Sequence, residues 1–213
     1  SVSHDLRTPL TTITALAHDM AALGDERADI IAQEAARLNR FVRDLLDVSR
    51  LTSGGMPVRP EVVPADELLS AALQQVEGAF NGREIRVSLD PSDPLLLGIF
   101  DPVQTVRALV NLLENAHKYA PAGTPIDLSV RKEGTHLTIT VADLGPGVPP
   151  HEVTRIFEPL YRPEGARPDA GSAGLGLAIA RGFAEAQEGS LGYAARDGGG
   201  SVFTLRIPAV DAP

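Results

Sequence analysis

Apolar residues recur at helical spacing through the first fifty residues of the chain. Ile31, Leu38 and Leu45 lie seven residues apart, a period typical of helices in a left-handed bundle. Gly24 interrupts the pattern, which predicts two helices joined as a hairpin. One hairpin cannot bury apolar stripes on both of its helices, so we expect two copies to pair as a dimeric four-helix bundle. The alternative is that the hairpin packs against the rest of its own chain.

A stretch rich in Gly and Pro at residues 53–60 ends the helical pattern and predicts a domain boundary. Beyond it, apolar and polar residues alternate in several short segments, which is typical of strands with one buried face. The predicted organisation is a helical dimerisation hairpin over 1–53, a linker over 54–60 and a second domain over 61–213.

The second domain mixes the periodicities of strands and helices. Strands are predicted over 85–89, 126–130, 137–141 and 202–207, and helices over 66–79, 102–118 and 174–188. The fold class is therefore α+β. We expect an α/β sandwich in which one mixed sheet is covered by helices on one face.

Composition narrows the functions that the chain can serve. It has 28 Asp and Glu against 19 Lys and Arg, a net charge of −9, which argues against a strong nonspecific hold on nucleic acid or an anionic membrane surface. It has no cysteine, so disulfides, thiolate metal sites and a cysteine nucleophile are excluded. No apolar run approaches the roughly 18 residues that a membrane span needs. Because the chain as a whole is negatively charged, any binding of phosphate groups needs a local site.

Asn111, Asn115 and Lys118 are spaced to share one face of the predicted helix over 102–118. Amide oxygens are hard neutral ligands that suit Mg2+, and an ammonium group suits a phosphate. The combination favours a nucleotide. The alternative is an ordinary solvated face opposite the apolar one.

Two glycine-rich segments lie further along the chain. Asp143 ends an alternating run and is followed by Gly145 and Gly147, so its carboxylate could accept a hydrogen bond from an amine while the glycines admit a flat ring. An ordinary turn has the same composition. Gly174-Leu175-Gly176 opens a helix, where free N–H groups can bind phosphate oxygens. Such a helix start is also common without a ligand.

The order of these segments resembles the nucleotide-binding domain of sensor histidine kinases. The Asn-rich helix is followed by the Asp-x-Gly-x-Gly segment, then by FEPLYR at 157–162, then by Gly-x-Gly-Leu. Type II topoisomerases, Hsp90 chaperones and MutL proteins share this superfamily, in which ATP lies between a mixed sheet's helices and a mobile lid. The segment SHDLRTPL at 3–10 resembles the phosphoacceptor box that distinguishes the kinases.

The chemistry of this box is consistent with phosphoryl transfer. His4 is a nucleophile whose neutral form is well populated near neutral pH. Asp5 could accept the imidazole proton during attack. Thr8, one helical turn later, could orient a water for hydrolysis of a partner's phosphoaspartate. The alternative for His4 is an ordinary surface histidine.

The resemblance also implies roles for the residues of the second domain. It assigns Mg2+ coordination to Asn115 and Asn111, phosphate contact to Lys118, adenine stacking to Tyr119, the adenine amine to Asp143, the lining of the base to Gly145 and Gly147, and the phosphates to Gly174, Leu175 and Gly176. Glycines 198–200 resemble the last glycine box of the family, although a plain hairpin turn explains them equally well.

The sequence thus predicts the catalytic core of a sensor histidine kinase. ATP would phosphorylate His4, and the phosphoryl group would pass to an Asp of a response regulator. One alternative is a response-regulator phosphatase or ATP-binding module, in which ATP is a conformational ligand. Another is an ATP-driven clamp like the chaperone and topoisomerase relatives, which leaves the His4 segment unexplained.

The predicted cofactors are ATP and Mg2+, and the predicted partners are a second copy of the chain and a receiver domain, with no nucleic acid. Because the sequence begins at Ser1 rather than at Met, we expect a fragment that spans no membrane itself. It would be the cytoplasmic part of a bacterial inner-membrane sensor. Within the family, SHDLRTPLT and NLLENAHKYA look most like the potassium-limitation sensor kinases.

Overall fold

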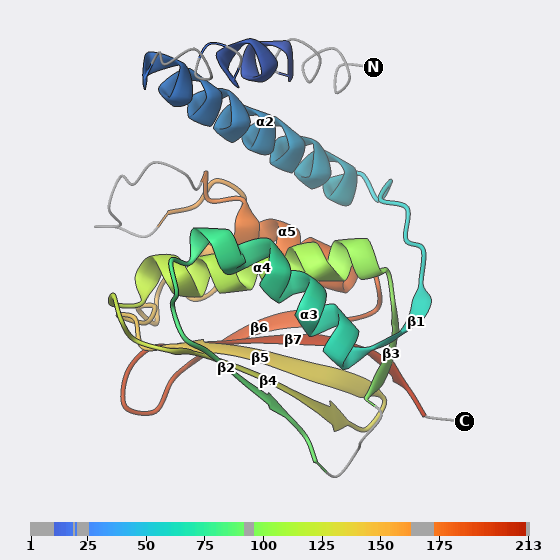
Figure 1. Ribbon diagram of the computed structural model, residues 1–213. Coiled ribbons are helices and arrows are strands. Elements are labelled where there is room, and N and C mark those ends of the chain that lie inside the picture. The colour runs from blue at the N-terminus through green and yellow to red at the C-terminus, as the bar shows by residue number, and fades with distance from the viewer. Residues whose placement is uncertain (1–10, 19, 21–25, 92–95, 163–172, 212–213) are drawn as a thin grey trace.

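Figure 1 shows the fold as a computed structural model, which describes residues 11–18, 20, 26–91, 96–162 and 173–211. Helical residues 11–18 lie near the start of the long helix α2 (Glu26–Thr52). The predicted break at Gly24 lies outside the described residues. Several large apolar side chains on the two helices are 39–62% exposed in the single chain: Ile13, Leu16, Ile30, Ile31, Leu38 and Leu45.

A seven-stranded sheet forms the base of the second domain. Its strands run in the order β1-β3-β7-β5-β4-β2, and β6 pairs with β7. The β2–β4 pair is parallel and the others are antiparallel, so the sheet is mixed, as predicted. The strands are β1 (Glu61–Pro64), β2 (Ile85–Leu89), β3 (Leu97–Phe100), β4 (Ile126–Glu133), β5 (His136–Asp143), β6 (Ser190–Ala195) and β7 (Ser201–Val210).

Three α-helices cover one face of this sheet (Figure 1). In β4, Ile126, Leu128 and Val130 are at most 1% exposed because alternate residues point to the helices. The core therefore lies between the sheet and the helices. The helices are α3 (Ala65–Val76), α4 (Pro102–Tyr119) and α5 (Gly176–Glu185), with short 3-10 turns η1 (Glu77–Ala79) and η2 (Arg155–Phe157).

The helix predicted to start at Gly174 begins two residues later. Gly174 has φ +72°, a left-handed backbone conformation that cannot continue into an α-helix. β1, β3 and β6 were not predicted. The first two have four residues each, and β6 reads SLGYAA, so none shows a clear alternating pattern. Their place in the sheet comes from pairing with partners distant in sequence.

The linker between α2 and β1 is held by the start of α4. The side chain of Asp101 caps α4 by accepting from Gln104 N–H at 3.1 Å, and it also accepts from Arg59 N–H at 3.0 Å. Gln104 Nε2 donates to the Pro57 carbonyl at 2.7 Å. The linker is thus anchored from Pro57 onward, which restricts a hinge to residues 53–56.

The C-terminal part of α2 lies against the second domain. Arg107 of α4 contacts Asp47 at 2.5 Å and Asp44 at 3.6 Å. Gly182 of α5 leaves room for Leu51, whose Cδ1 would lie 2.6 Å from a Cβ at that position. The hairpin therefore packs on its own chain at this end, while several large apolar residues further along the helices remain exposed.

Candidate functional site

Helix α4 presents its Asn side chains because its other side is apolar. Leu109 and Leu112 are fully buried in the core, whereas Asn111 and Asn115 are partly exposed. Asn111 Nδ2 donates to the carbonyl of Gly176, the first residue of α5, at 3.1 Å. This bond joins α4 to α5 and orients the amide so that Asn111 Oδ1 stays an acceptor.

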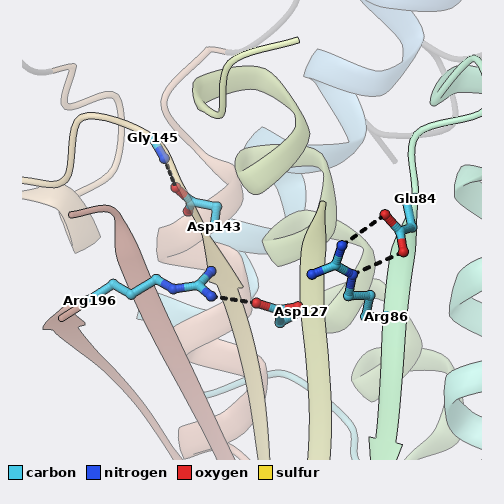
Figure 2. A network of polar contacts seen from close by, with 6 residues as sticks. All are labelled: Glu84, Arg86, Asp127, Asp143, Gly145 and Arg196. Carbon is cyan, nitrogen blue, oxygen red and sulfur yellow. Dashed lines mark hydrogen bonds and ion pairs between the residues drawn. The ribbon is translucent and has the colours of Figure 1, made fainter. Parts of the chain in front are cut away.

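Asp143 ends β5 with only 1% of its surface exposed. Its Oδ1 accepts a hydrogen bond from Gly145 N–H at 2.6 Å, as Figure 2 shows. Burial raises the pKa of the Asp143 carboxyl, and hydrogen bonds from Gly145 and Ser201 oppose that rise. A carboxylate offers about four acceptor positions, so these bonds fix its orientation and leave room for a further N–H donor.

The hairpin formed by β6 and β7 packs directly under this turn. Gly200 has φ +118°, and a Cβ there would lie 2.0 Å from the carbonyl oxygen of Asp143. Gly147 has φ +73°, and its Cβ would lie 3.2 Å from the Gly200 carbonyl oxygen. Glycine is required at both positions by the backbone conformation and the close approach. Glycines 198–200 therefore form a hairpin turn that also contacts the Asp143 segment.

The end of α4 meets the same turn from the other side. A Cβ at Gly145 would lie 3.0 Å from the Tyr119 carbonyl oxygen. The Lys118 ammonium lies 5.0 Å from the centroid of the Tyr119 ring. Lys118 and Tyr119 thus lie next to the Asp143 turn, although they are far from it in sequence.

The start of α5 is shaped by a second tight glycine contact. A Cβ at Gly174 would lie 2.5 Å from the Tyr161 carbonyl oxygen, and Leu160 N–H donates to the Gly174 carbonyl at 2.9 Å. Leu175 is 2% exposed and belongs to the core, so only its backbone can reach a ligand. Gly176 then opens the helix beside Asn111.

A groove of about 1390 Å³ opens beside this end of α5. Asn111 and Gly176 line it on one side, and α2 residues from Ile30 to Asp44 line it on the other. The face of the site that carries Asn111 therefore opens toward the hairpin.

The structure brings candidate residues of the second domain together in two groups along α4: Asn111 with Gly176, and Tyr119 with the Asp143 turn. His4, Asp5 and Thr8 lie outside the described residues. Sequence reasoning missed Tyr193 and Ser201, which contact the Asp143 segment from β6 and β7. Neither belongs to a recognisable motif, and only strand pairing could have revealed them.

An Asn-bearing helix and two glycine turns thus lie together on the helix-covered side of a mixed sheet, the arrangement expected of an ATPase domain. Residues 100–211 match the family model described as histidine kinase-, DNA gyrase B-, and HSP90-like ATPase. Residues 1–54 match the His kinase A phospho-acceptor domain. The chain belongs to the sensor histidine kinase family and comprises its phospho-acceptor and ATPase domains.

Curated relatives of the chain include proteins named as sensor kinases or sensor proteins. The chain is 35% identical to the sensor-like histidine kinase SenX3 of Mycobacterium tuberculosis, over 99% of the chain and 53% of the relative. It is 36% identical to the sensor protein KdpD of Escherichia coli, over 100% of the chain and 24% of the relative. The chain thus spans about half or less of these relatives. Because the sequence identities to SenX3 and to KdpD are nearly equal, they do not single out one subgroup. Membership of the potassium-limitation subgroup therefore stays a prediction.

Solved structures agree with the fold. Full-length ShkA in complex with AMPPNP matches 99% of this chain and 45% of that one, with a TM-score of 0.81 at 26% identity. The mycobacterial sensor histidine kinase MprB matches 72% of this chain and 100% of that one, with a TM-score of 0.62 at 26% identity. Within the part of the chain that the structure describes, no helix has both the length and the apolar character needed to cross a bilayer.

Proposed function

We propose that the chain transfers the γ-phosphoryl group of ATP to His4 and then to an Asp of a response regulator. The main support is the convergence of segments that are distant in sequence. Asn111 bonds Gly176, while the Asp143 turn lies between Tyr119 and the β6–β7 hairpin. The match of residues 1–54 to a phospho-acceptor domain supplies the second reactant.

The adenine end of the site is assigned to the Asp143 turn. The buried Asp143 carboxylate would accept the exocyclic amine, and Gly145 and Gly147 would allow the ring to lie against the backbone. The Tyr119 ring would stack on the base. A carboxylate distinguishes adenine from guanine because guanine presents a carbonyl where adenine presents an amine.

The phosphate end is assigned to α4 and the start of α5. Lys118 would contact phosphate as a point charge, and the N–H groups of residues 174–176 lie at a helix N-terminus, which favours an anion. These contacts would hold the triphosphate tail on the side of the site that opens to the hairpin.

The residues present fit Mg2+. The Asn111 amide nitrogen is engaged with Gly176, so its oxygen is the atom available to a cation, and Asn115 lies one turn further on the same face. Amide oxygens, waters and substrate phosphates are the ligands that Mg2+ prefers. When bound, the ion would neutralise negative charge on the phosphates.

In the transfer step, a ring nitrogen of neutral His4 attacks the γ-phosphorus and the bond to the β-phosphate oxygen breaks, which yields ADP. Asp5 accepts the ring proton. In the second step, a carboxylate of the receiver domain attacks the phosphohistidine, the P–N bond breaks and the imidazole regains a proton. Thr8 would orient water when the regulator is dephosphorylated.

The assembly is proposed to be a homodimer. Exposed apolar residues along both hairpin helices, including Leu38 and Leu45, would be covered in a four-helix bundle with a second copy. The other partner is the receiver domain of a response regulator. We further propose that the chain acts on the cytoplasmic side of a bacterial inner membrane as part of a longer sensor.

Incubation with γ-labelled ATP and Mg2+ tests the proposal. Label should enter the chain in an acid-labile, alkali-stable form, and the matched variant His4→Gln should take up none. ADP binding should be the same in both proteins, because all the proposed nucleotide contacts come from the second domain. Nucleotide binding without any labelling of the parent chain would refute the kinase activity.

A further inference from the structure

Tyr193 of β6 makes a hydrogen bond to the nucleotide-site turn that the proposed function does not use. Its hydroxyl oxygen accepts from Val148 N–H at 2.8 Å. The same oxygen would lie 3.6 Å from a Cβ at Gly147. The Tyr193 ring is half-buried and meets Phe203 edge-on, with centroids 5.4 Å apart. Ring packing therefore fixes the hydroxyl in place beneath the turn.

The hairpin that carries Tyr193 is itself held rigidly. Arg196, just after β6, reaches across the sheet to Asp127 of β4 at 2.5 Å (Figure 2). Its backbone N–H donates to the Gly200 carbonyl at 3.1 Å, which closes the hairpin. Gly200 in turn packs on the backbone of Asp143. Tyr193 thus belongs to a β6–β7 hairpin that is anchored to β4 and to the backbone of Asp143.

We infer that Tyr193 is a positioning residue of the nucleotide site: its hydroxyl fixes the Gly147–Val148 backbone and so sets the width of the adenine slot. On the other side of the turn, a Cβ added at Gly145 would lie 3.0 Å from the Tyr119 carbonyl oxygen. The turn is therefore held between α4 and the hairpin. This inference rests on the proposed function, because it assigns the adenine to that turn.

Loss of the hydroxyl leaves the partly buried Val148 N–H without this acceptor, and leaving such a donor unpaired costs more than the hydrogen bond itself contributes. We expect the turn to shift toward solvent so that the Val148 N–H can bond water. Nucleotide binding must then reverse this shift of the turn. We expect about tenfold weaker nucleotide binding in Tyr193→Phe. The transfer step itself should be unaffected, because Tyr193 contacts neither phosphate nor His4 in this scheme.

The test compares Tyr193→Phe with Thr140→Val in the full chain. Thr140 also carries a hydroxyl in this sheet, where it bonds Ser129 at 2.7 Å, away from the turn. Calorimetric titration with ADP and Mg2+ gives the Kd, and labelling rates over a range of ATP concentrations give KM and kcat. Tyr193→Phe should raise Kd and KM about tenfold with kcat unchanged. Thr140→Val should leave all three unchanged.

A second readout reports on the hydrogen bond directly. Amide exchange at Val148 should accelerate in Tyr193→Phe and not in Thr140→Val. If the Kd and KM of Tyr193→Phe equal those of the parent, the inference is overturned and the proposed function still stands. Equal losses in both variants would also overturn it, because the effect would then be a general weakening of the sheet. A parent chain that binds no nucleotide would overturn both proposals together.

Discussion

Arg107 makes a close ion pair between the second domain and α2, and its removal should weaken their docking. Its Nη2 lies 2.5 Å from Asp47 and 3.6 Å from Asp44, and its guanidinium lies 5.1 Å from the Phe183 ring centroid. The Asp47 side chain is only 7% exposed, whereas that of Arg107 is 29% exposed. Arg107→Ala would leave a nearly buried carboxylate without this partner.

The size of the effect follows from these exposures. Removing one partner of a buried ion pair costs about 3–5 kcal/mol, and the partial exposure of Arg107 reduces this to about 2 kcal/mol. At about 1.4 kcal/mol per factor of ten, the ratio of docked to undocked chains should fall roughly 30-fold. Burial raises the pKa of Asp44, and the Arg107 charge opposes this, so the pKa should rise further in the variant.

Distance measurements between spin labels can test this directly, because the chain has no cysteine of its own. One label is attached through Ser49→Cys on α2 and the other through Ser70→Cys on α3, both at exposed positions. Arg107→Ala should broaden the distance distribution. The exchange Asp47→Arg with Arg107→Asp should restore much of it.

Arg86→Ala is the matched control, since it breaks an exposed Arg–Glu pair at 2.9 Å within one edge of the sheet (Figure 2). It should leave the distribution unchanged. A parental distribution in Arg107→Ala would show that apolar contacts such as Leu51 on Gly182 are sufficient for docking. The reasoning from the ion pair would then be wrong.

Two further predictions concern the Asp143 turn. Asp143→Asn should weaken adenine nucleotide binding at least about tenfold, yet unfold at higher temperature than the parent near pH 7.5. Because the pKa of Asp143 is raised in the folded chain, the parent loses stability as the pH rises through that pKa. The denaturation temperatures of the variant and the parent should therefore come closer together at lower pH. A difference that stays constant with pH would contradict the raised pKa of Asp143. Gly200→Ala should cost about 3 kcal/mol or more in urea unfolding, because a Cβ would meet the Asp143 carbonyl oxygen at 2.0 Å. Gly198→Ala, with φ +84° and nothing within 4 Å, should cost only about 1 kcal/mol, and equal losses would refute the role of the close contact.

The sequence alone predicted the elements that have a strong local pattern. Helix α4 combines a full apolar face with an Asp cap and a proline at its start, and β5 alternates without interruption. The order of the Asn, Asp-Gly and Gly-Leu segments, together with the His4 box, was enough to indicate the family. These signals are local because helix and strand periods are properties of neighbouring residues.

Only the tertiary structure decided how these segments meet. Val148 and Tyr193 are 45 residues apart, and Arg107 and Asp47 are 60 residues apart. No periodicity connects such pairs, since strand order and the docking of α2 determine them. The sequence thus predicted candidate residues for nucleotide binding and for accepting a phosphoryl group. The fold decided which of them are adjacent, because a hydrogen bond or ion pair depends on distances of a few ångströms that only the packed chain defines.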